Sequence, residues 1–267
     1  MCYSALVKRD LDYLGRKYGA IVIRDQIEDY HRAAAENPKR FPPLDDRIFP
    51  GHYAPVIYER DGKRVLELMR YGAYPKSSVV DPKSYTTFNA RRDNLTSSFW
   101  DEAFMKRHGF VVLDGFYEWV KVQDLLKAGV VAIEEVRSEF QRQADERKAK
   151  IIEAGKKYKP TPTELKDPRF RQIIIEFKPM DGRELLVPAI FSATVLENGR
   201  QDKGFAVVTD EPPPEVRAAG HDRCPMILEA EAVAQWLGSD KRTPKQWDEV
   251  LARGARVTFK HKLAEAA

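Results

Sequence analysis

Apolar residues along this chain recur at two different spacings, which separates expected helices from expected strands. Leu11, Leu14 and Tyr18 share one helical face, and a glycine that can end the helix follows them. A second helix is expected at about 25–36. The segment Thr243-Pro-Lys-Gln246 predicts another helix start, because Thr243 can cap the helix, proline suits the first helical position, and Gln246 can return the hydrogen bond.

Other apolar runs are short, rich in β-branched or aromatic residues, and in several cases alternate with polar residues, which is typical of strands. The runs at 65–69, 110–113, 172–177, 185–195, 205–209 and 256–259 have this character. Residues 37–55, rich in Pro, Asp and Gly, are expected to form an irregular surface loop. Because the strands show no regular alternation with helices, the pattern favours an α+β fold with a curled, mostly antiparallel, barrel-like sheet.

A charged segment at about 121–168 differs from the rest of the chain. Almost no turn residues interrupt it up to Lys159, and its apolar positions have helical spacing. We expect a long helix or helical hairpin that stands off the sheet, ended by Pro160, Pro162 and Pro168. Such an insertion is either an arm that touches DNA or a partner, helped by lysines near its end, or a solvated segment with no specific role.

Composition limits the class of protein. With 267 residues, 43% hydrophobic residues and a formal net charge of +4, the chain is expected to fold as one domain that permits, without requiring, a nucleic-acid partner. Its two cysteines, Cys2 and Cys224, make a disulfide framework improbable and favour a reducing, cytoplasmic location. No apolar run is long enough to span a bilayer, and no signal peptide is recognisable. Neither a metal nor another cofactor is expected, since the five histidines show no compact ligand spacing.

The most distinctive chemistry is at the start of the chain. If Met1 is removed, Cys2 carries an α-amine beside its thiol. An aldehyde can form an imine with the amine, and the sulfur can then close a five-membered thiazolidine ring. Both groups keep a reactive minority form near neutral pH. Taken alone, however, Cys2 is better explained as an accident of sequence, and the motifs farther along the chain change this interpretation.

Three further residues are candidates for proton transfer or positioning. Glu118 follows an apolar strand and an expected turn at Gly115, and it stands between two aromatic residues, where its carboxylate can be partly desolvated and its pKa raised. His221 is in an expected loop and titrates where proton shuttling is useful. Asn89 is the third candidate. Each also has an ordinary structural explanation, as a turn residue, a solvated carboxylate or a satisfied loop histidine.

In combination, the motifs resemble the SRAP (SOS response-associated peptidase) family. They are Cys2 directly after Met1, Asn-Ala-Arg at 89–91, Gly-Phe-Tyr-Glu-Trp at 115–119 and His-Asp-Arg-x-Pro at 221–225. They occur in family order and cover the chain to about Leu237. The resemblance implies a single curled α+β domain over 1–267 that acts as a monomer on abasic sites in single-stranded DNA. It implies a covalent thiazolidine crosslink that shields the lesion, with possible lyase and autopeptidase activity.

The resemblance also implies roles for single residues. Cys2 would be the nucleophile, Asn89 would orient the N-terminus and the opened sugar, and Glu118 would hold or deprotonate the α-amine. His221 would exchange protons with the sugar and with the adduct. The expected DNA contacts are Arg91 at a phosphate, Trp119 against a base or as a buttress, and the nearby basic residues Arg92 and Lys76.

Some positions depart from the family pattern. Tyr3-Ser4-Ala5 stands where members commonly have Gly-Arg-Phe, so one expected phosphate-binding arginine is missing, a loss for which Arg92 partly compensates. Cys224 is expected to be a small buried residue. Two other functions remain open: a thiol peptidase that uses Cys2, Glu118 and His221, and a non-covalent binder of single-stranded or modified DNA.

Overall fold

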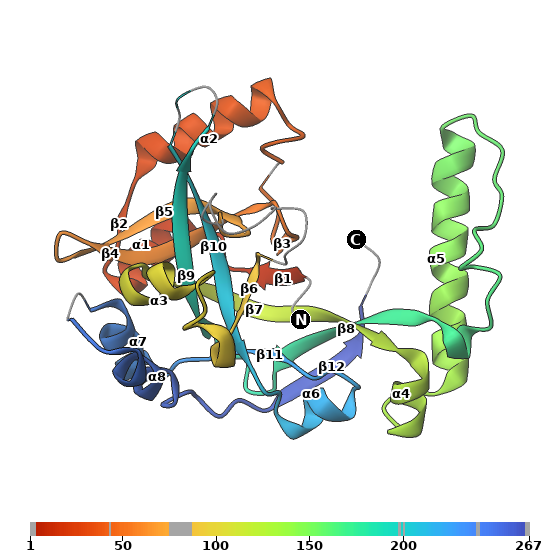
Figure 1. Cartoon of the computed structure of the whole chain (residues 1–267). Coiled ribbons are helices and arrows are strands. Elements are labelled where there is room, and N and C mark those ends of the chain that lie inside the picture. Colours follow the sequence, from red (N-terminus) through yellow and green to blue (C-terminus); the bar gives the residue numbers. More distant parts are fainter. Residues whose placement is uncertain are drawn as a thin grey trace.

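The computed structural model describes residues 4–42, 44–74, 87–196, 199, 201–238 and 241–264. Five strands form a closed ring, in the order β4, β5, β10, β9 and β7 and back to β4. All pairs in this ring are antiparallel except β5 with β10. The expected α+β class with a curled, mostly antiparallel, barrel-like sheet is therefore confirmed (Figure 1).

The strands are β1 (Ser4–Val7), β2 (Ile21–Val22), β3 (Arg47–Ile48), β4 (Tyr53–Arg60), β5 (Lys63–Tyr71), β6 (Asn89–Arg91), β7 (His108–Lys121), β8 (Gln172–Pro179), β9 (Leu185–Val195), β10 (Gln201–Asp210), β11 (Cys224–Pro225) and β12 (Phe259–Leu263). The helices are α1 (Leu11–Tyr18), α2 (Arg24–Glu36), α3 (Asp101–Lys106), α4 (Val122–Lys127), α5 (Ile133–Glu153), α6 (Pro214–Ala218), α7 (Ala230–Leu237) and α8 (Pro244–Leu251), with short 3-10 turns at Arg92–Asn94 and Pro168–Phe170.

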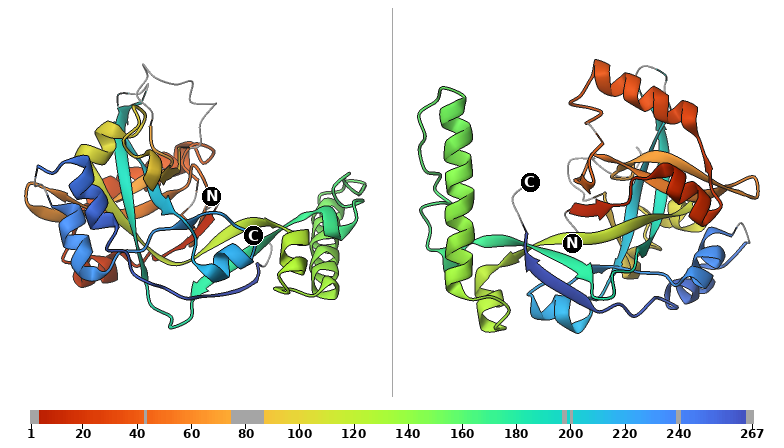
Figure 2. Two further views of the ribbon diagram at one scale, coloured as in Figure 1. Left: turned by 60° about the horizontal axis from the view of Figure 1, so that its bottom comes forward. Right: turned by 180° about the vertical axis from the view of Figure 1, so that it is seen from behind.

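Strand β7 joins two halves of the sheet. Its first half pairs with β4 and β9 in the ring, and its second half pairs with β1 on one side and β8 on the other. β8 in turn pairs with β12. The second half of β7 therefore extends out of the barrel, and β1 pairs along one of its edges (Figure 2).

A β-bulge in β7 changes which side chains face the core. Along β1, Leu6 pairs with Gly115 whereas Val7 pairs with Leu113, so Asp114 is an extra residue without a partner in this register. Before the bulge Val111 and Leu113 belong to the main core cluster, and after it the even-numbered positions, beginning with Phe116, belong to the same cluster. Bulges commonly re-aim side chains beside functional sites. Here the bulge turns Glu118 toward the interior.

Helices cover the barrel on several sides. α7 and α8 pack with α1 and α3 over one core cluster, centred on Trp236 and Trp247. α2 covers the outer side of β4 and β5 through Tyr30, which packs against Tyr53. The expected end of α1 and start of α8 are confirmed: Gly19 ends α1 with φ of 63°, and Thr243 and Gln246 form the predicted capping box of α8.

The expected insertion is only partly peripheral. α5 stands away from the body as a 21-residue arm, and the chain returns beside it (Figure 1). However, α4 and the first turns of α5 are anchored in the main core by Val122, Leu125, Val136 and Phe140, all of which are buried. Of this segment, only the part beyond Phe140 lacks buried side chains.

Several sequence predictions were wrong in detail. The loop expected at 37–55 contains β3 and the start of β4, because Tyr53 and Ala54 are buried strand residues. The strand expected at 256–259 begins only at Phe259. Gly115 does not form a turn: β7 continues through it, and a side chain there would meet the carbonyl oxygen of Phe177 at 2.6 Å.

Candidate active site

A buried carboxylate and an imidazole meet at the inner face of β7. The Nε2 atom of His221 lies 3.0 Å from Oε2 of Glu118. Glu118 is 1% exposed, and its aim into the interior follows from the bulge at Asp114. The sequence predicted both residues separately, and the structure brings them into direct contact.

Backbone contacts fix the orientation of His221. Its Nδ1 lies 2.8 Å from the carbonyl oxygen of Arg223. The backbone nitrogen of Arg223 lies 3.3 Å from the same Nδ1, so the ring is held through this atom by both backbone groups of Arg223. Nε2 is the nitrogen directed at Glu118, in position to exchange a proton with its carboxyl group.

Burial dominates the protonation of Glu118. Removal of the carboxylate from water raises its pKa above the usual value, and the hydrogen bond with His221 opposes this only in part. A carboxyl group with a raised pKa can act as an acid or a base closer to neutral pH than an exposed glutamate. The raised pKa expected from the flanking aromatic residues agrees with this environment.

The loop that carries His221 rests on α4. Gly220 has φ of 84°, a left-handed conformation that ends α6 and that side-chain-bearing residues rarely adopt. A Cβ at Gly220 would lie 2.8 Å from Cβ of Asp124. Sequence reasoning missed both Gly220 and Asp124 as supports of the site. The glycine directly before His221 was the available signal.

Asn89 lies at the same end of β10 as the His221 loop. β6 pairs with β10 in parallel, with Asn89 opposite Val207, while β11, which follows His221, pairs with the end of β10 through Cys224 and Asp210. Asn89 is buried, and the hydroxyl of Tyr71 approaches its Oδ1 at 3.4 Å. The side chain is therefore held inside the fold, as a positioning residue requires.

Arg91 and the His221 loop are linked by charge. Arg91 donates to both carboxylate oxygens of Asp93, and the guanidinium of Arg223 lies 3.9 Å from the same carboxylate. Asp222 also acts on Arg91 electrostatically. Arg91 is exposed, and a phosphate contact by its guanidinium stays a prediction.

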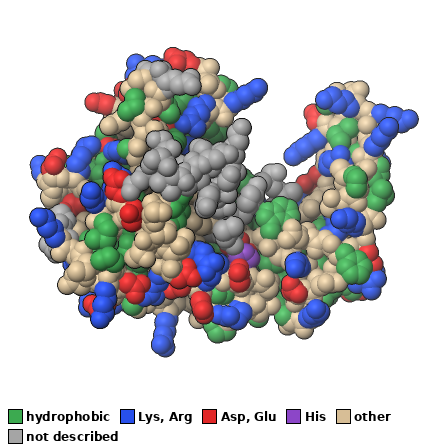
Figure 3. All heavy atoms as spheres, in the orientation of Figure 1, with side chains coloured by type: hydrophobic (Ala, Val, Ile, Leu, Met, Phe, Trp, Pro, Cys, Tyr) green, Lys and Arg blue, Asp and Glu red, His purple; other side chains and the backbone are tan. Residues whose placement is uncertain are grey.

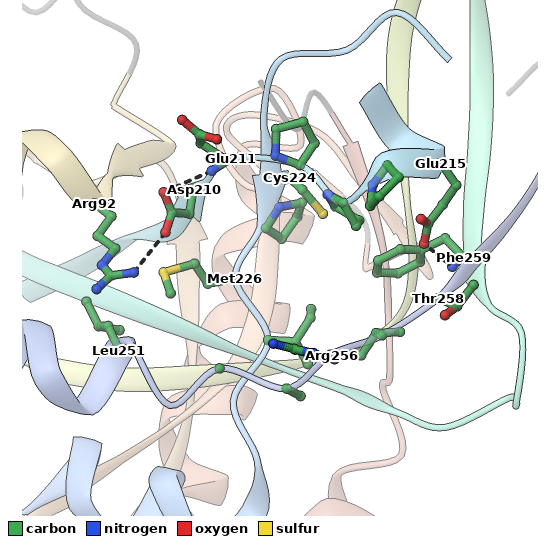
Figure 4. Close-up of a pocket in the computed structure, with 18 of the residues that line it drawn as sticks. Arg92, Asp210, Glu211, Glu215, Cys224, Met226, Leu251, Arg256, Thr258 and Phe259 are labelled. Atoms are coloured by element: carbon green, nitrogen blue, oxygen red, sulfur yellow. Dashed lines mark hydrogen bonds and ion pairs between the residues drawn. The ribbon is translucent and has the colours of Figure 1, made fainter. Parts of the chain in front are cut away.

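Arg92 pairs with residues from two other elements, whereas Arg91 pairs with the nearby Asp93. The guanidinium of Arg92 lies 3.0 Å from Asp210 and 2.6 Å from Asp248, and so ties the 3-10 turn after β6 to the end of β10 and to α8. Arg92 and Asp210 line a cavity of about 490 Å³ that Cys224 and Met226 also border (Figure 4). Glu118, His221 and Asn89 are not among its lining residues, so this cavity is separate from the buried pair. A DNA contact by Arg92 stays a prediction, and it would require the guanidinium to leave both carboxylates.

The remaining predicted residues differ in what can be said of them. Trp119 is 42% exposed on the outer face of β7, next to the buried Glu118. Cys224 is buried, as expected. Cys2 and Lys76 lie outside the described residues. The described chain begins at Ser4, which is fully buried and pairs with Tyr117.

Neither a metal cluster nor a membrane helix is found in the part of the chain that the structure describes. No three His, Cys, Asp or Glu side chains in these segments gather as metal ligands. No helix there combines the length and apolar composition that crossing a bilayer requires.

Comparison with protein families identifies the group to which the chain belongs. The profile of the SOS response associated peptidase (SRAP) family matches residues 14–262. The chain belongs to the SRAP family. Its family name associates it with the response to DNA damage and with peptidase activity. The match includes Asn89, Glu118 and His221 and begins downstream of Cys2.

Solved structures share the SRAP fold of this chain. A protein from Bacteroides thetaiotaomicron matches with a TM-score of 0.62 and 14% identity, over 98% of this chain and 91% of the other. A protein from Bordetella bronchiseptica matches with a TM-score of 0.59 and 14% identity, over 99% and 100%. A phage-related protein from the same organism gives 0.53 and 17%, over 86% and 89%. A search of curated proteins found no match.

Proposed function

We propose that this SRAP protein shields abasic sites in single-stranded DNA by forming a covalent crosslink through Cys2 after removal of Met1. The crosslink is a thiazolidine formed with the aldehyde of the ring-opened deoxyribose. This conclusion extends the association with DNA damage that the family name carries.

The observation that carries the proposal is the buried Glu118–His221 pair, whose glutamate lies on β7, the strand that pairs with β1. Ser4 pairs with Tyr117, the residue before Glu118. Consecutive Cα atoms are about 3.8 Å apart, so two residues of chain keep the Cα of Cys2 within about 8 Å of that of Ser4. An acid–base pair is thus within reach of the only residue that combines an N-terminal amine with a thiol.

The chemistry requires several proton transfers. The neutral amine of Cys2 attacks the aldehyde carbon, a proton reaches the carbonyl oxygen, and water leaves to give the imine. The thiolate then adds to the imine carbon, and the nitrogen takes up a proton, which closes the thiazolidine. In this sequence Glu118 accepts a proton from the amine and His221 supplies one to the departing oxygen, because both groups can carry a proton and they are in direct contact.

Other residues bind the strand around the reacting sugar. Asn89 positions the opened sugar from its buried place on β6. Arg91 binds a phosphate, and the exposed ring of Trp119 stacks on a base, an interaction worth about 1–3 kcal/mol in single-strand binders. The partner is therefore single-stranded DNA with an abasic site.

The family name favours a second candidate, a thiol peptidase. The same carboxylate and imidazole could serve a cysteine nucleophile that cleaves a peptide bond, including the bond after Met1. Such a protein would release peptide products and would form no stable adduct with DNA.

An adduct assay with and without reductant tests the proposal. Wild-type protein should form an adduct with an abasic oligonucleotide that survives heat and denaturant without borohydride, because a thiazolidine has no imine left to reduce. Cys2→Ala retains an amine and should give an adduct only when borohydride traps the imine. A stable adduct with Cys2→Ala in the absence of reductant would contradict the proposed ring closure. Absence of any wild-type adduct would favour the peptidase or the non-covalent binder.

A further inference from the structure

The distal part of the arm has a strongly basic composition. Residues 147–159 contain six basic residues and one acidic residue, whereas residues 133–146 contain two basic and five acidic residues. The net charge of the arm is therefore negative near the body, at 133–146, and positive at the far end, at 147–159. A solvated helix needs no such separation, since mixed charges would keep it soluble equally well.

Beyond its contacts with the core, the arm is stabilised by contacts between α5 and the returning chain. No side chain of α5 beyond Phe140 is buried, and a short isolated helix is only marginally stable in water. Glu164, on the returning chain, accepts hydrogen bonds from the backbone and hydroxyl groups of Thr161 and lies 2.6 Å from the guanidinium of Arg147. This clip fixes the returning chain against the helix, so the end of the arm has a defined position.

The lysines beyond the clip are available to a partner. Five of them are exposed and form no ion pair within the described ranges: Lys148, Lys150, Lys156, Lys157 and Lys159. Two arginines of α5 differ from these lysines, since Arg142 pairs with Glu139 and Glu146, and Arg147 pairs with Glu164. Figure 3 shows Lys and Arg side chains gathered around the outer end of the arm.

The arm faces the side of the body where the chain begins. β1 lies on that side in both views of the whole molecule, and the second half of β7 connects the body to the arm (Figures 1 and 2). α5 has 21 residues, which corresponds to a length of about 30 Å. The arm is therefore long enough to contact several nucleotides of a single strand that leaves the Glu118–His221 pair in its direction.

We infer that the lysines at the end of the arm bind the phosphate backbone of the single strand that carries the lesion, several nucleotides from the reacting sugar. The identity of this polymer rests on the proposed function. The separation of charge supports a polyanion over a protein partner, because six basic residues against one acidic residue, Glu153, make up 147–159, and its lysines are flexible point charges suited to phosphates.

The test compares two variants with the same loss of charge. One carries Lys150→Gln, Lys156→Gln and Lys157→Gln at the end of the arm. The other carries Arg16→Gln, Lys63→Gln and Lys245→Gln, exposed residues of α1, β5 and α8 on the far side of the body. Affinity for undamaged single-stranded DNA is measured against salt concentration, with one oligonucleotide of about 30 nucleotides and another of about five, too short to extend far along the arm.

The arm variant should bind the long oligonucleotide at least about tenfold more weakly at 0.1 M salt, and the slope of log K against log salt should fall by about 2. The short oligonucleotide should bind both variants alike, and the control variant should change little with either length. Equal affinity of the two variants for the long oligonucleotide would overturn the inference. In that case the lysines of the arm would not bind DNA, and a protein would be the better candidate for their partner.

Crosslinking separates this inference from the proposed function. The arm variant should still form the adduct with a short abasic oligonucleotide, because its site is intact. A wild-type protein that forms no adduct, but whose binding to the long strand depends on the arm lysines, would refute the covalent function and support the arm contact.

Discussion

Nε2 of His221 lies 3.0 Å from Oε2 of Glu118, although one residue comes from a long strand and the other from a loop after a five-residue helix. The strand contributes a fully buried carboxylate, and the loop contributes an imidazole whose second nitrogen is fixed by the Arg223 carbonyl. Proton transfer at this pair should therefore depend on both the bulge in β7 and the support of the loop.

Replacement of Glu118 by Gln should make adduct formation slow and less dependent on pH. In the wild type the carboxyl group has a raised pKa, so the fraction able to accept a proton grows as pH rises through that pKa. The ratio of wild-type to Glu118→Gln rates, measured by quenched adduct formation, should be largest near neutral pH. At high pH the amine loses its proton to solvent and the difference should shrink. An equal ratio at both pH values would argue against Glu118 as the base.

Glu118→Gln should also raise stability relative to the wild type as pH increases. Because the folded-state pKa of Glu118 is above its unfolded value, its contribution is fully present below the unfolded pKa and is lost as pH rises through the folded pKa. Glu118→Gln lacks this loss. The melting temperature of Glu118→Gln minus that of the wild type should thus increase with pH. A difference that stays constant across pH would contradict the burial of an ionisable carboxyl group.

Gly220→Ala should impair the site more than Gly129→Ala. Both glycines have positive φ, of 84° and 66°, so both variants bear a strain of about 1–2 kcal/mol. Only at Gly220 would the new Cβ also meet Asp124, whereas Gly129 has no atom within 4 Å of that position. Thermal unfolding should show a further loss of about 1–3 kcal/mol for Gly220→Ala. Adduct formation should slow only in this variant.

Arg91 and Arg92 should respond differently to alanine. Arg92→Ala removes two ion pairs of a partly buried guanidinium and should lower the free energy of unfolding by about 1 kcal/mol. Arg91→Ala should leave thermal stability unchanged and reduce the salt slope of single-strand binding by about 0.7, the value for one lost phosphate contact. If Arg92→Ala instead weakens DNA binding and leaves stability unchanged, the guanidinium of Arg92 binds DNA and does not stabilise the fold.

Two deletions should separate the core part of the insertion from the arm. Removal of 148–159, with a short Gly/Ser linker, retains the clip between Arg147 and Glu164 and all four anchors in the core, so the protein should stay folded and form the adduct. Removal of 122–159 deletes four buried side chains, each worth about 2–5 kcal/mol, and their combined loss is as large as the usual stability of about 5–15 kcal/mol. Circular dichroism should show that this second variant is unfolded. A folded 122–159 deletion would mean that α4 is dispensable.

Sequence reasoning was most successful where local chemistry decides the structure. The capping box at Thr243 and the glycine stop after Tyr18 involve only neighbouring residues, and both were predicted. The barrel-like sheet followed from strands without regular helical crossovers, and the SRAP family followed from the motifs.

Features that depend on distant contacts were missed. Gly115 looks like a turn residue in sequence, but its role is to let β7 pass close to the backbone of Phe177. Val122 and Leu125 looked like the start of a detached helix, yet they complete the core under the His221 loop. Glu118 and His221 were each recognised as candidates from the residues alone, and only the fold shows that they are in contact.

The central claim is tested most directly by the intact mass of the protein before and after incubation with a single-stranded oligonucleotide that carries one abasic site. The account predicts a purified protein without Met1 and a denaturation-resistant species heavier by the oligonucleotide minus one water, both for the wild type. Cys2→Ala should give no such stable species. Retention of Met1 in the wild-type protein, or a stable adduct that persists in Cys2→Ala, would contradict the assignment of Cys2 as the crosslinking residue.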